Sequence, residues 1–192
     1  MSISRNIFAA LAMAIVLPVT AAAPMPAGAS TPASAKSLAK DLLPSSYAKK
    51  AGFTKVARKV ATSSKTGLKS CPNGAQETFE SASGQTALAS EVVACTTDEA
   101  AAALVKSSRS GASVTSAQPP KRLGSSAIEH VSGAIYEIVW QRGTIVEAVA
   151  LNINVPASAG SSTSTTIAAL PITSAQQEVL SSAAVKQDAQ LK

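Results

Sequence analysis

The chain has 192 residues, a mass of 19.2 kDa and a formal net charge of +6, from 17 Lys and Arg residues against 11 Asp and Glu residues. Its length fits one domain, because domains commonly span about 100 to 200 residues. Aromatic residues make up only 3% of the chain, which has one His, one Trp and two Cys. This composition argues against a His-rich metal site, a zinc ribbon and a nucleic-acid platform of stacked rings. We therefore expect no metal, no cofactor and no nucleic-acid partner.

The first 29 residues have the layout of a secretory signal peptide. Arg5 precedes an apolar run over residues 7–19, which small residues follow, as in signal sequences that are removed on export. Small side chains suit cleavage after residues 21–23 or after residues 27–29. The second site is preferred, because Pro24 directly follows the first. We therefore predict a protein that is secreted or held outside the cytoplasm in the cell envelope.

The alternative for this segment is an uncleaved membrane anchor. Pro18 and Pro24 interrupt its apolar run, which is already shorter than the about 20 apolar residues that a membrane-spanning helix needs. We expect cleavage, and hence no stable transmembrane span in the mature form. Residues 30–35, made of Ser, Thr, Pro and Ala, then form a short linker, and residues 36–192 form one folded domain.

Export gives the two cysteines a structural meaning, because thiols outside the cytoplasm tend to oxidise. Residues 75–81 and 86–94 are strand-like, and the turn sequence Ala82-Ser83-Gly84-Gln85 joins them. Antiparallel pairing about this turn makes the numbers of paired residues sum to about 167, which brings Cys71 and Cys95 to the open end of one hairpin. We predict a disulfide between them, with two unrelated buried thiols as the alternative.

The segment before this hairpin combines a helix with an ambiguous stretch. A helix is predicted over residues 37–43, because Leu38 and Leu42 share one face and Pro44 stops it. Residues 53–68 fit either a helix or a strand.

Two further helices are indicated by their first residues. Thr96 and Glu99 match a capping box, which predicts a helix over residues 97–109. Thr173 begins a second possible cap, ahead of a helix that runs to about residue 190. The side chains expected to face the core from this last helix are Val179, Leu180, Ala183 and Leu191.

The clearest β pattern lies in the second half of the chain. Residues 134–140 and 145–155 are apolar and strand-like, and Arg142-Gly143 would form the two central residues of a tight turn between them. That turn places Trp140 opposite Ile145. Both faces of these strands are largely apolar, so the sheet is covered on both sides or curls around its own filling.

The order of elements predicts the fold class. Residues 127–131 add a further strand, and the polar, low-complexity residues 156–166 are expected to form a flexible surface loop. Strands joined by short turns form antiparallel sheets, and intervening helices then cover a sheet face. We predict a single α+β domain, with a curved antiparallel sheet and the helices packed on one side.

Catalytic residues are hard to find in this sequence. His130 is the only imidazole, and a nucleophilic Ser or Cys needs such a base beside it. Ser125 and Ser126 are close in sequence, but no Gly-x-Ser-x-Gly elbow is present. Six glutamates on strand candidates would allow a carboxylate pair: Glu77, Glu80, Glu91, Glu129, Glu137 and Glu147. We expect no enzyme, and keep a hydrolase of envelope material as the alternative.

One segment is strongly basic. Residues 36–69 carry nine basic residues and one acidic residue, Asp41, whereas the rest of the chain after residue 29 carries seven basic and ten acidic residues. A local field of this kind favours contact with anionic material outside the membrane; the alternative is a solvated basic face or a flexible arm. The residues predicted to bind an anionic surface are Lys49, Lys50, Lys55, Arg58 and Lys59.

Several features occur together in this alanine-rich chain: cysteines flanking a hairpin, a helix after Cys95, and the sequences Leu-Gly-Ser-Ser-Ala at 123–127, Trp-Gln-Arg-Gly at 140–143 and Gln-Asp-Ala-Gln-Leu at 187–191. Over roughly residues 40–192 the chain resembles small secreted or lipid-anchored α+β proteins of actinobacteria, including the extracytoplasmic sensor-type domains of mycobacterial Ser/Thr kinases. The resemblance implies a pocket-bearing or partner-binding domain without catalytic activity. The expected partners are an anionic envelope surface or a small apolar ligand in the cavity of the sheet.

Overall fold

The computed structural model describes residues 32–62, 69–108, 113–114, 118–153 and 171–191. The predicted signal peptide, the start of the linker, Lys65 and the predicted flexible loop at 156–166 lie outside the described residues.

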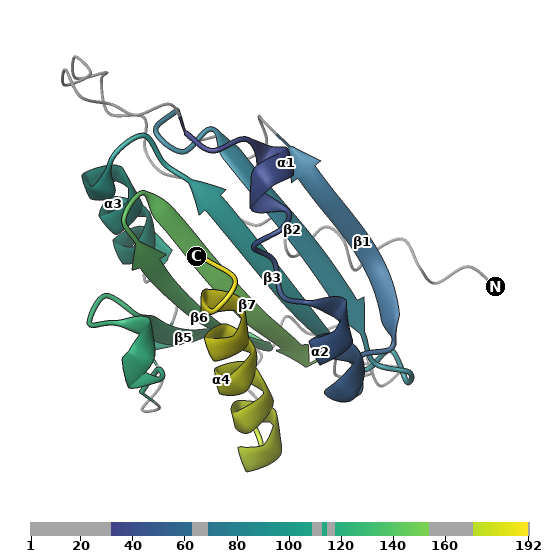
Figure 1. Ribbon diagram of the computed structural model, residues 1–192. Helices are drawn as coiled ribbons and strands as arrows, with labels where there is room; N and C mark the ends of the chain where they lie inside the picture. The colour runs from purple at the N-terminus through teal and green to yellow at the C-terminus, as the bar shows by residue number, and fades with distance from the viewer. Residues whose placement is uncertain (1–31, 63–68, 109–112, 115–117, 154–170, 192) are drawn as a thin grey trace, which may run out of the picture.

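Seven strands form one antiparallel sheet, in the order β1-β2-β3-β7-β6-β5-β4 (Figure 1). The strands are β1 (Lys55–Thr62), β2 (Asn73–Glu80), β3 (Thr86–Ala94), β4 (Ser113–Val114), β5 (Ile128–Ser132), β6 (Ile135–Arg142) and β7 (Ile145–Ile153). β7 pairs with both β3 and β6, so the two hairpins of the chain join into one continuous sheet. The predicted α+β class and the antiparallel sheet are confirmed.

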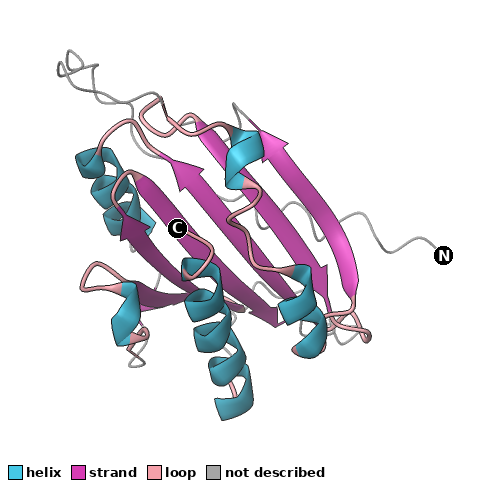
Figure 2. Ribbon diagram, in the orientation of Figure 1, coloured by secondary structure: helices cyan, strands magenta, loops and turns pink. Residues whose placement is uncertain are grey.

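Helices cover both faces of this sheet. They are α1 (Ala35–Leu38), α2 (Ser45–Lys50), α3 (Asp98–Ser108) and α4 (Ser174–Asp188), with a short 3-10 turn, η2 (Lys121–Leu123). In Figure 2, α1, α2 and α4 lie on the near side of the sheet. Leu180 and Ala183 of α4 pack there against alternate strand residues such as Trp140 and Leu151.

The remaining helix, α3, packs on the opposite face. Leu104 and Val105 of α3 contact Val93, Val139 and Val146, which alternate along their strands with the residues under α4. The expected one-sided arrangement therefore holds for α1, α2 and α4, while α3 uses the second apolar face that the strand sequences provide. We call the two faces the α4 face and the α3 face.

The first hairpin has the predicted register. Asn73 pairs with Ala94 and Glu80 with Ala87, so the numbers of each pair sum to 167. Gly84 adopts a φ of 68° in the connecting turn, a conformation that glycine reaches without steric cost. The turn chemistry was enough to set this register.

In the second hairpin the predicted register is wrong by two residues. Trp140 pairs with Glu147 rather than with Ile145, which pairs instead with Arg142. The turn centres on Gly143 and the following threonine, because the glycine, with a φ of 56°, takes the first central position and not the second. A slip of two residues leaves every side chain on its predicted face, so Trp140 is still buried in the core.

The N-terminal segment departs from the predicted helix over residues 37–43. The helix α1 begins and ends earlier, and the backbone N–H of Leu43 donates to Ser90 Oγ at 2.9 Å instead of to a preceding carbonyl. A helix through Leu43 would have to give up this bond to the buried strand β3. After α2, the ambiguous residues 53–68 contain a strand, β1.

The predicted cap is correct for one of the two longer helices and displaced for the other. The predicted capping box of α4 is confirmed, since Thr173 and Gln176 make both reciprocal bonds. At α3 the cap is one residue later than predicted: the N–H of Ala100 donates to Thr97 Oγ1 at 3.1 Å. Thr96 instead donates its own N–H to the carbonyl of Ser70 at 2.8 Å, which holds it in the strand end.

One of the four residues expected to face the core from α4 lies outside the core. Leu180 and Ala183 are fully buried and Val179 is partly buried, as predicted, whereas Leu191 follows the end of the helix and is partly exposed. Gln187 is the inward residue of the last turn instead, and it is fully buried.

Candidate functional site

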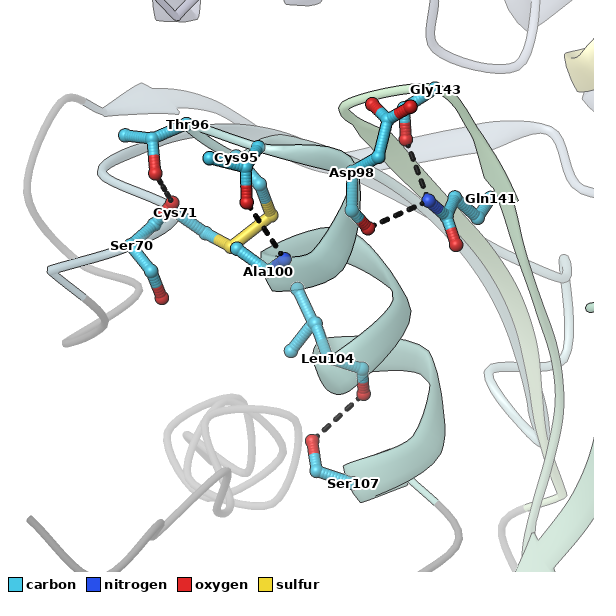
Figure 3. The surroundings of a disulfide bond; sticks show 11 residues. Ser70, Cys71, Cys95, Thr96, Asp98, Ala100, Leu104, Ser107, Gln141 and Gly143 are labelled. Carbon is cyan, nitrogen blue, oxygen red and sulfur yellow. Dashed lines mark hydrogen bonds between the residues drawn. A yellow bond between two sulfur atoms is a disulfide. The ribbon is translucent and has the colours of Figure 1, made fainter. Parts of the chain in front are cut away.

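The predicted disulfide between Cys71 and Cys95 is present, and both residues are buried. It ties the start of β2 to the end of β3, directly before α3 (Figure 3). Nearby, Gln141 Nε2 donates to the carbonyls of Asp98 at 2.9 Å and Gly143 at 2.8 Å, which links the β6–β7 turn to the first turn of α3. The disulfide is a structural bond at the edge of the α3 core, and it fits an oxidising environment.

The structure places three of the predicted anion-binding residues on an edge strand of the sheet and two on a helix that packs on the α4 face. Lys49 and Lys50 end α2 and are both exposed. Lys55, Arg58 and Lys59 lie on β1, the outermost strand on that side. Exposed lysines of α1, of the segment after it and of the start of the next hairpin extend this set. We call the whole group the basic edge: Lys36, Lys40, Lys49, Lys50, Lys55, Arg58, Lys59 and Lys69.

Acidic residues face only part of the basic edge. Asp41 is its only acidic residue in sequence, and partial burial raises the pKa of this carboxyl, against a smaller opposing effect of Lys40. Along the pairing of β1 with β2, Lys55 is in register with Glu80 and Lys59 with Glu77. Lys49 and Lys50 lie on α2, outside this ladder.

The depressions on the surface of the described residues include two open grooves. The larger, of about 450 Å³, lies between α2, η2 and α4. The smaller, of about 220 Å³, lies beside α3 and is lined in part by Ser125, Ser126 and Lys106.

His130 does not assemble a hydrolytic site with the residues named from the sequence. It is 4% exposed, and its Nε2 lies 3.1 Å from Glu137 Oε2. Ser125 and Ser126 are exposed and line the smaller groove, whereas neither His130 nor Glu137 lines either groove.

The predicted glutamates are divided between the two faces of the sheet. Glu129 and Glu147 alternate with the α3-face residues and lie under α4, where Gln177 Nε2 donates to the Glu129 carboxylate at 3.0 Å. Glu91 and Glu137 belong to the α3 face. Burial, and then repulsion by Glu137, raise the pKa of Glu91 to about 7.

Sequence reasoning missed a buried polar cluster beneath α4. Glu147 is 0% exposed, and burial, followed by repulsion from Asp188, raises its pKa to about 8. Beside it, Ser90 Oγ donates to Gln187 Oε1 at 2.7 Å, and Trp140 Nε1 donates to Asp188 Oδ1 at 3.2 Å. The alternation of β7 did carry a signal, because Glu147 is two residues before the core residue Val149 and so shares its face.

Comparisons of the chain with protein-family models, with curated proteins and with solved structures find no match. The resemblance to extracytoplasmic actinobacterial domains therefore stays a prediction. Within the described ranges, no three His, Cys, Asp or Glu side chains gather as a metal site would need. None of the helices described here has both the length and the apolar character to cross a membrane.

Proposed function

We propose that the protein is an exported, non-enzymatic binding protein of the cell envelope, and that its basic edge attaches it to anionic surfaces. The observation that carries this proposal is the concentration of exposed lysines on α1, α2 and the neighbouring segments, beside a remainder of the chain that is net acidic. The proposal agrees with the disulfide, which suits an oxidising compartment outside the cytoplasm.

The strength expected of such attachment follows from simple electrostatics. Near an anionic surface each basic residue contributes up to about 1 kcal/mol, and the attraction fades within a Debye length of about 8 Å at physiological salt. The five residues predicted from the sequence are therefore enough for detectable binding that salt weakens. They occupy a continuous stretch of chain, from the end of α2 through the edge strand β1.

A purely structural role explains only part of the basic edge. Lysines on an outermost strand prevent that strand from pairing with another molecule, which accounts for basic residues on β1. It does not account for Lys49 and Lys50, which are exposed on a helix, or for Lys36 and Lys40. Attachment to an anionic surface accounts for both groups.

A hydrolase is the second candidate, and the contact between His130 and Glu137 is the observation that favours it. A general base must reach its substrate, yet His130 is 4% exposed and lies away from both grooves. The exposed Ser125 and Ser126 line a groove without this imidazole. The structure thus offers better support for binding than for hydrolysis.

Sedimentation of the full chain with vesicles tests the proposal. The chain should pellet with vesicles that contain phosphatidylglycerol and not with vesicles of phosphatidylcholine alone, and high salt should release it. Changing Lys49, Lys50, Lys55, Arg58 and Lys59 together to Gln should abolish pelleting. Binding that ignores both salt and these substitutions would show that the basic edge is only a solvated surface.

A further inference from the structure

The larger groove is the surface feature that the proposed function leaves unexplained. Three elements far apart in sequence form its walls: α2, η2 and α4. Its lining combines two cationic side chains, three hydroxyl groups and a few small apolar residues. These are Tyr47, Pro120, Arg122, Ser181, Ser182, Val185, Lys186 and Ala189.

Hydrogen bonds hold the walls of this groove in place. Arg142 bridges two of them: its Nε donates to Asp188 Oδ1 of α4 at 2.8 Å, and its Nη2 donates to the carbonyl of Arg122 in η2 at 2.7 Å. The third wall is attached through Tyr47, whose hydroxyl donates to the carbonyl of Val179 in α4 at 3.3 Å. The groove is therefore preorganised, which reduces the entropy lost when a ligand binds.

The chemistry of the lining selects an anion. Arg122 and Lys186 are both exposed and project from different walls, and guanidinium and ammonium groups are donors only. Ser182, four residues before Lys186 on α4, also lines the groove and hydrogen-bonds Tyr47. An Arg fork fits the oxygens of a phosphate group, while Lys adds a point charge.

The carboxylates near the groove do not cancel these cations. Asp188 is already held by Arg142 and Trp140, and 9% of its side chain is exposed. Burial raises the pKa of the Tyr47 phenol, against the hydrogen bond from Ser182, and Glu178 adds a smaller rise. Tyr47 therefore keeps the proton that it donates to the Val179 carbonyl.

We propose that this groove binds a single phosphate group, carried by a lipid headgroup or by a phosphate-containing envelope polymer. The inference rests on the proposed function and gives the basic edge a specific contact. Tyr47 and Lys50 are three residues apart on α2, and residues at this spacing lie about 5 to 6 Å apart on one side of a helix. Lys50 of the basic edge therefore lies next to one wall of the groove.

The test uses the full chain and two double variants with the same loss of charge. Arg122→Gln with Lys186→Gln removes both cations of the groove. The matched control, Lys106→Gln with Lys121→Gln, removes two exposed lysines that do not line it. The bond from Arg142 to η2 uses the backbone carbonyl of residue 122, so the groove variant keeps its wall in place.

Titration with glycerol phosphate, followed by NMR, should give saturable shifts at Ser182 and Arg122 in the full chain. The groove variant should bind at least about tenfold more weakly, because both charge-assisted contacts to the phosphate are lost, and the control variant should bind as the full chain does. Equal weakening in both variants, or no saturable shift, would overturn the site.

Vesicles then separate the two sources of phosphate and the two proposals. If phosphatidylglycerol vesicles compete with glycerol phosphate for the groove, the source is a lipid headgroup; if only soluble glycerol phosphate polymers compete, the source is a polymer. Vesicle binding that is lost in the five-residue variant of the basic edge but kept in the groove variant would support the proposed function and reject this inference. Vesicle binding that is lost in the groove variant but kept in the five-residue variant would support the groove and reject the basic edge.

Discussion

The two faces of the sheet bury their carboxylates in different ways. On the α4 face, Glu147 is completely enclosed beneath a helix, and its pKa is raised to about 8. On the α3 face, Glu91 and Glu137 are only partly buried, and His130 lies 3.1 Å from Glu137. Burial raises the carboxyl pKa on both faces, to about 8 for Glu147 and to about 7 for Glu91. Of these three glutamates, Glu137 is the one that has an imidazole beside it.

This difference follows from what covers each face. α4 brings Leu180, Ala183 and Ala184 against the strands, and all three are 0% exposed. α3 has 11 residues against the 15 of α4, and among the described residues it packs at the end of the sheet near the disulfide. The same β strands therefore support an apolar core on both sides, with Glu147 buried on the α4 face and the pair of His130 and Glu137 on the α3 face.

The largest effect expected from this difference between the two faces is the pH dependence of stability that Glu147 causes. Its folded pKa of about 8 lies above the ordinary value of 4.5, so between these pH values the folded state keeps a proton that the unfolded state has lost. The contribution of Glu147 to stability should therefore be greatest below pH 4.5 and should fall by about 5 kcal/mol as pH rises toward 8. Glu91, with a folded pKa of about 7, should add a decline of about 3 kcal/mol.

Glu147→Gln isolates this effect, because an amide of similar shape does not ionise. Urea unfolding across this pH range should show that the variant loses the larger part of the decline and keeps the smaller part that Glu91 causes. Glu178→Gln, an exposed position on α4, should keep both parts. A decline of the same size in the Glu147→Gln protein would assign it to another group and remove the contrast between the faces.

The second largest effect on stability is expected on the α3 face, where the disulfide joins residues 24 positions apart. Changing Cys71 and Cys95 together to Ala should lower the free energy of unfolding by about 3 kcal/mol, because the unfolded chain gains freedom. Reduction of the unaltered protein should cause a similar loss in chemical denaturation. The expectation fails if denatured, unreduced protein shows two titratable thiols per chain.

The smallest effect concerns the coupling between carboxylates within the α3 face. Repulsion from Glu137 contributes, after burial, to the raised pKa of Glu91. Glu137→Gln should therefore lower the pKa of Glu91 and leave that of Glu147 unchanged, with a change in stability below about 1 kcal/mol. Carbon-13 NMR of the glutamate carboxyls measures both values, and a matching shift at Glu147 would contradict the separation of the two faces.

Local chemistry decided which parts of the fold were predictable from sequence. The first hairpin followed from one turn sequence with Gly84, and the cap at Thr173 from a four-residue pattern. The second hairpin slipped by two residues because two successive positions, Arg142 and Gly143, could begin its turn. The face of every paired residue was still correct, since alternation does not depend on that choice.

The candidate sites were less accessible to such reasoning. The basic edge was visible as a charge imbalance in one stretch of chain. The groove was not, because Tyr47, Arg122 and Lys186 meet only through the packing of α4 against η2 and α2. The burial of Gln187 likewise depended on its contact with Ser90, a residue of a distant strand.

Attachment through the basic edge is tested most directly by the salt dependence of binding to phosphatidylglycerol vesicles. The measurement compares the unaltered full chain with Lys49→Gln/Lys50→Gln and with the equally charged Lys106→Gln/Lys121→Gln. The basic-edge variant should bind about tenfold more weakly at low salt and depend less steeply on salt, since two surface contacts of up to about 1 kcal/mol each are lost. The control variant should follow the unaltered chain. Equal curves for the two variants would show that only net charge matters and would contradict a dedicated attachment surface.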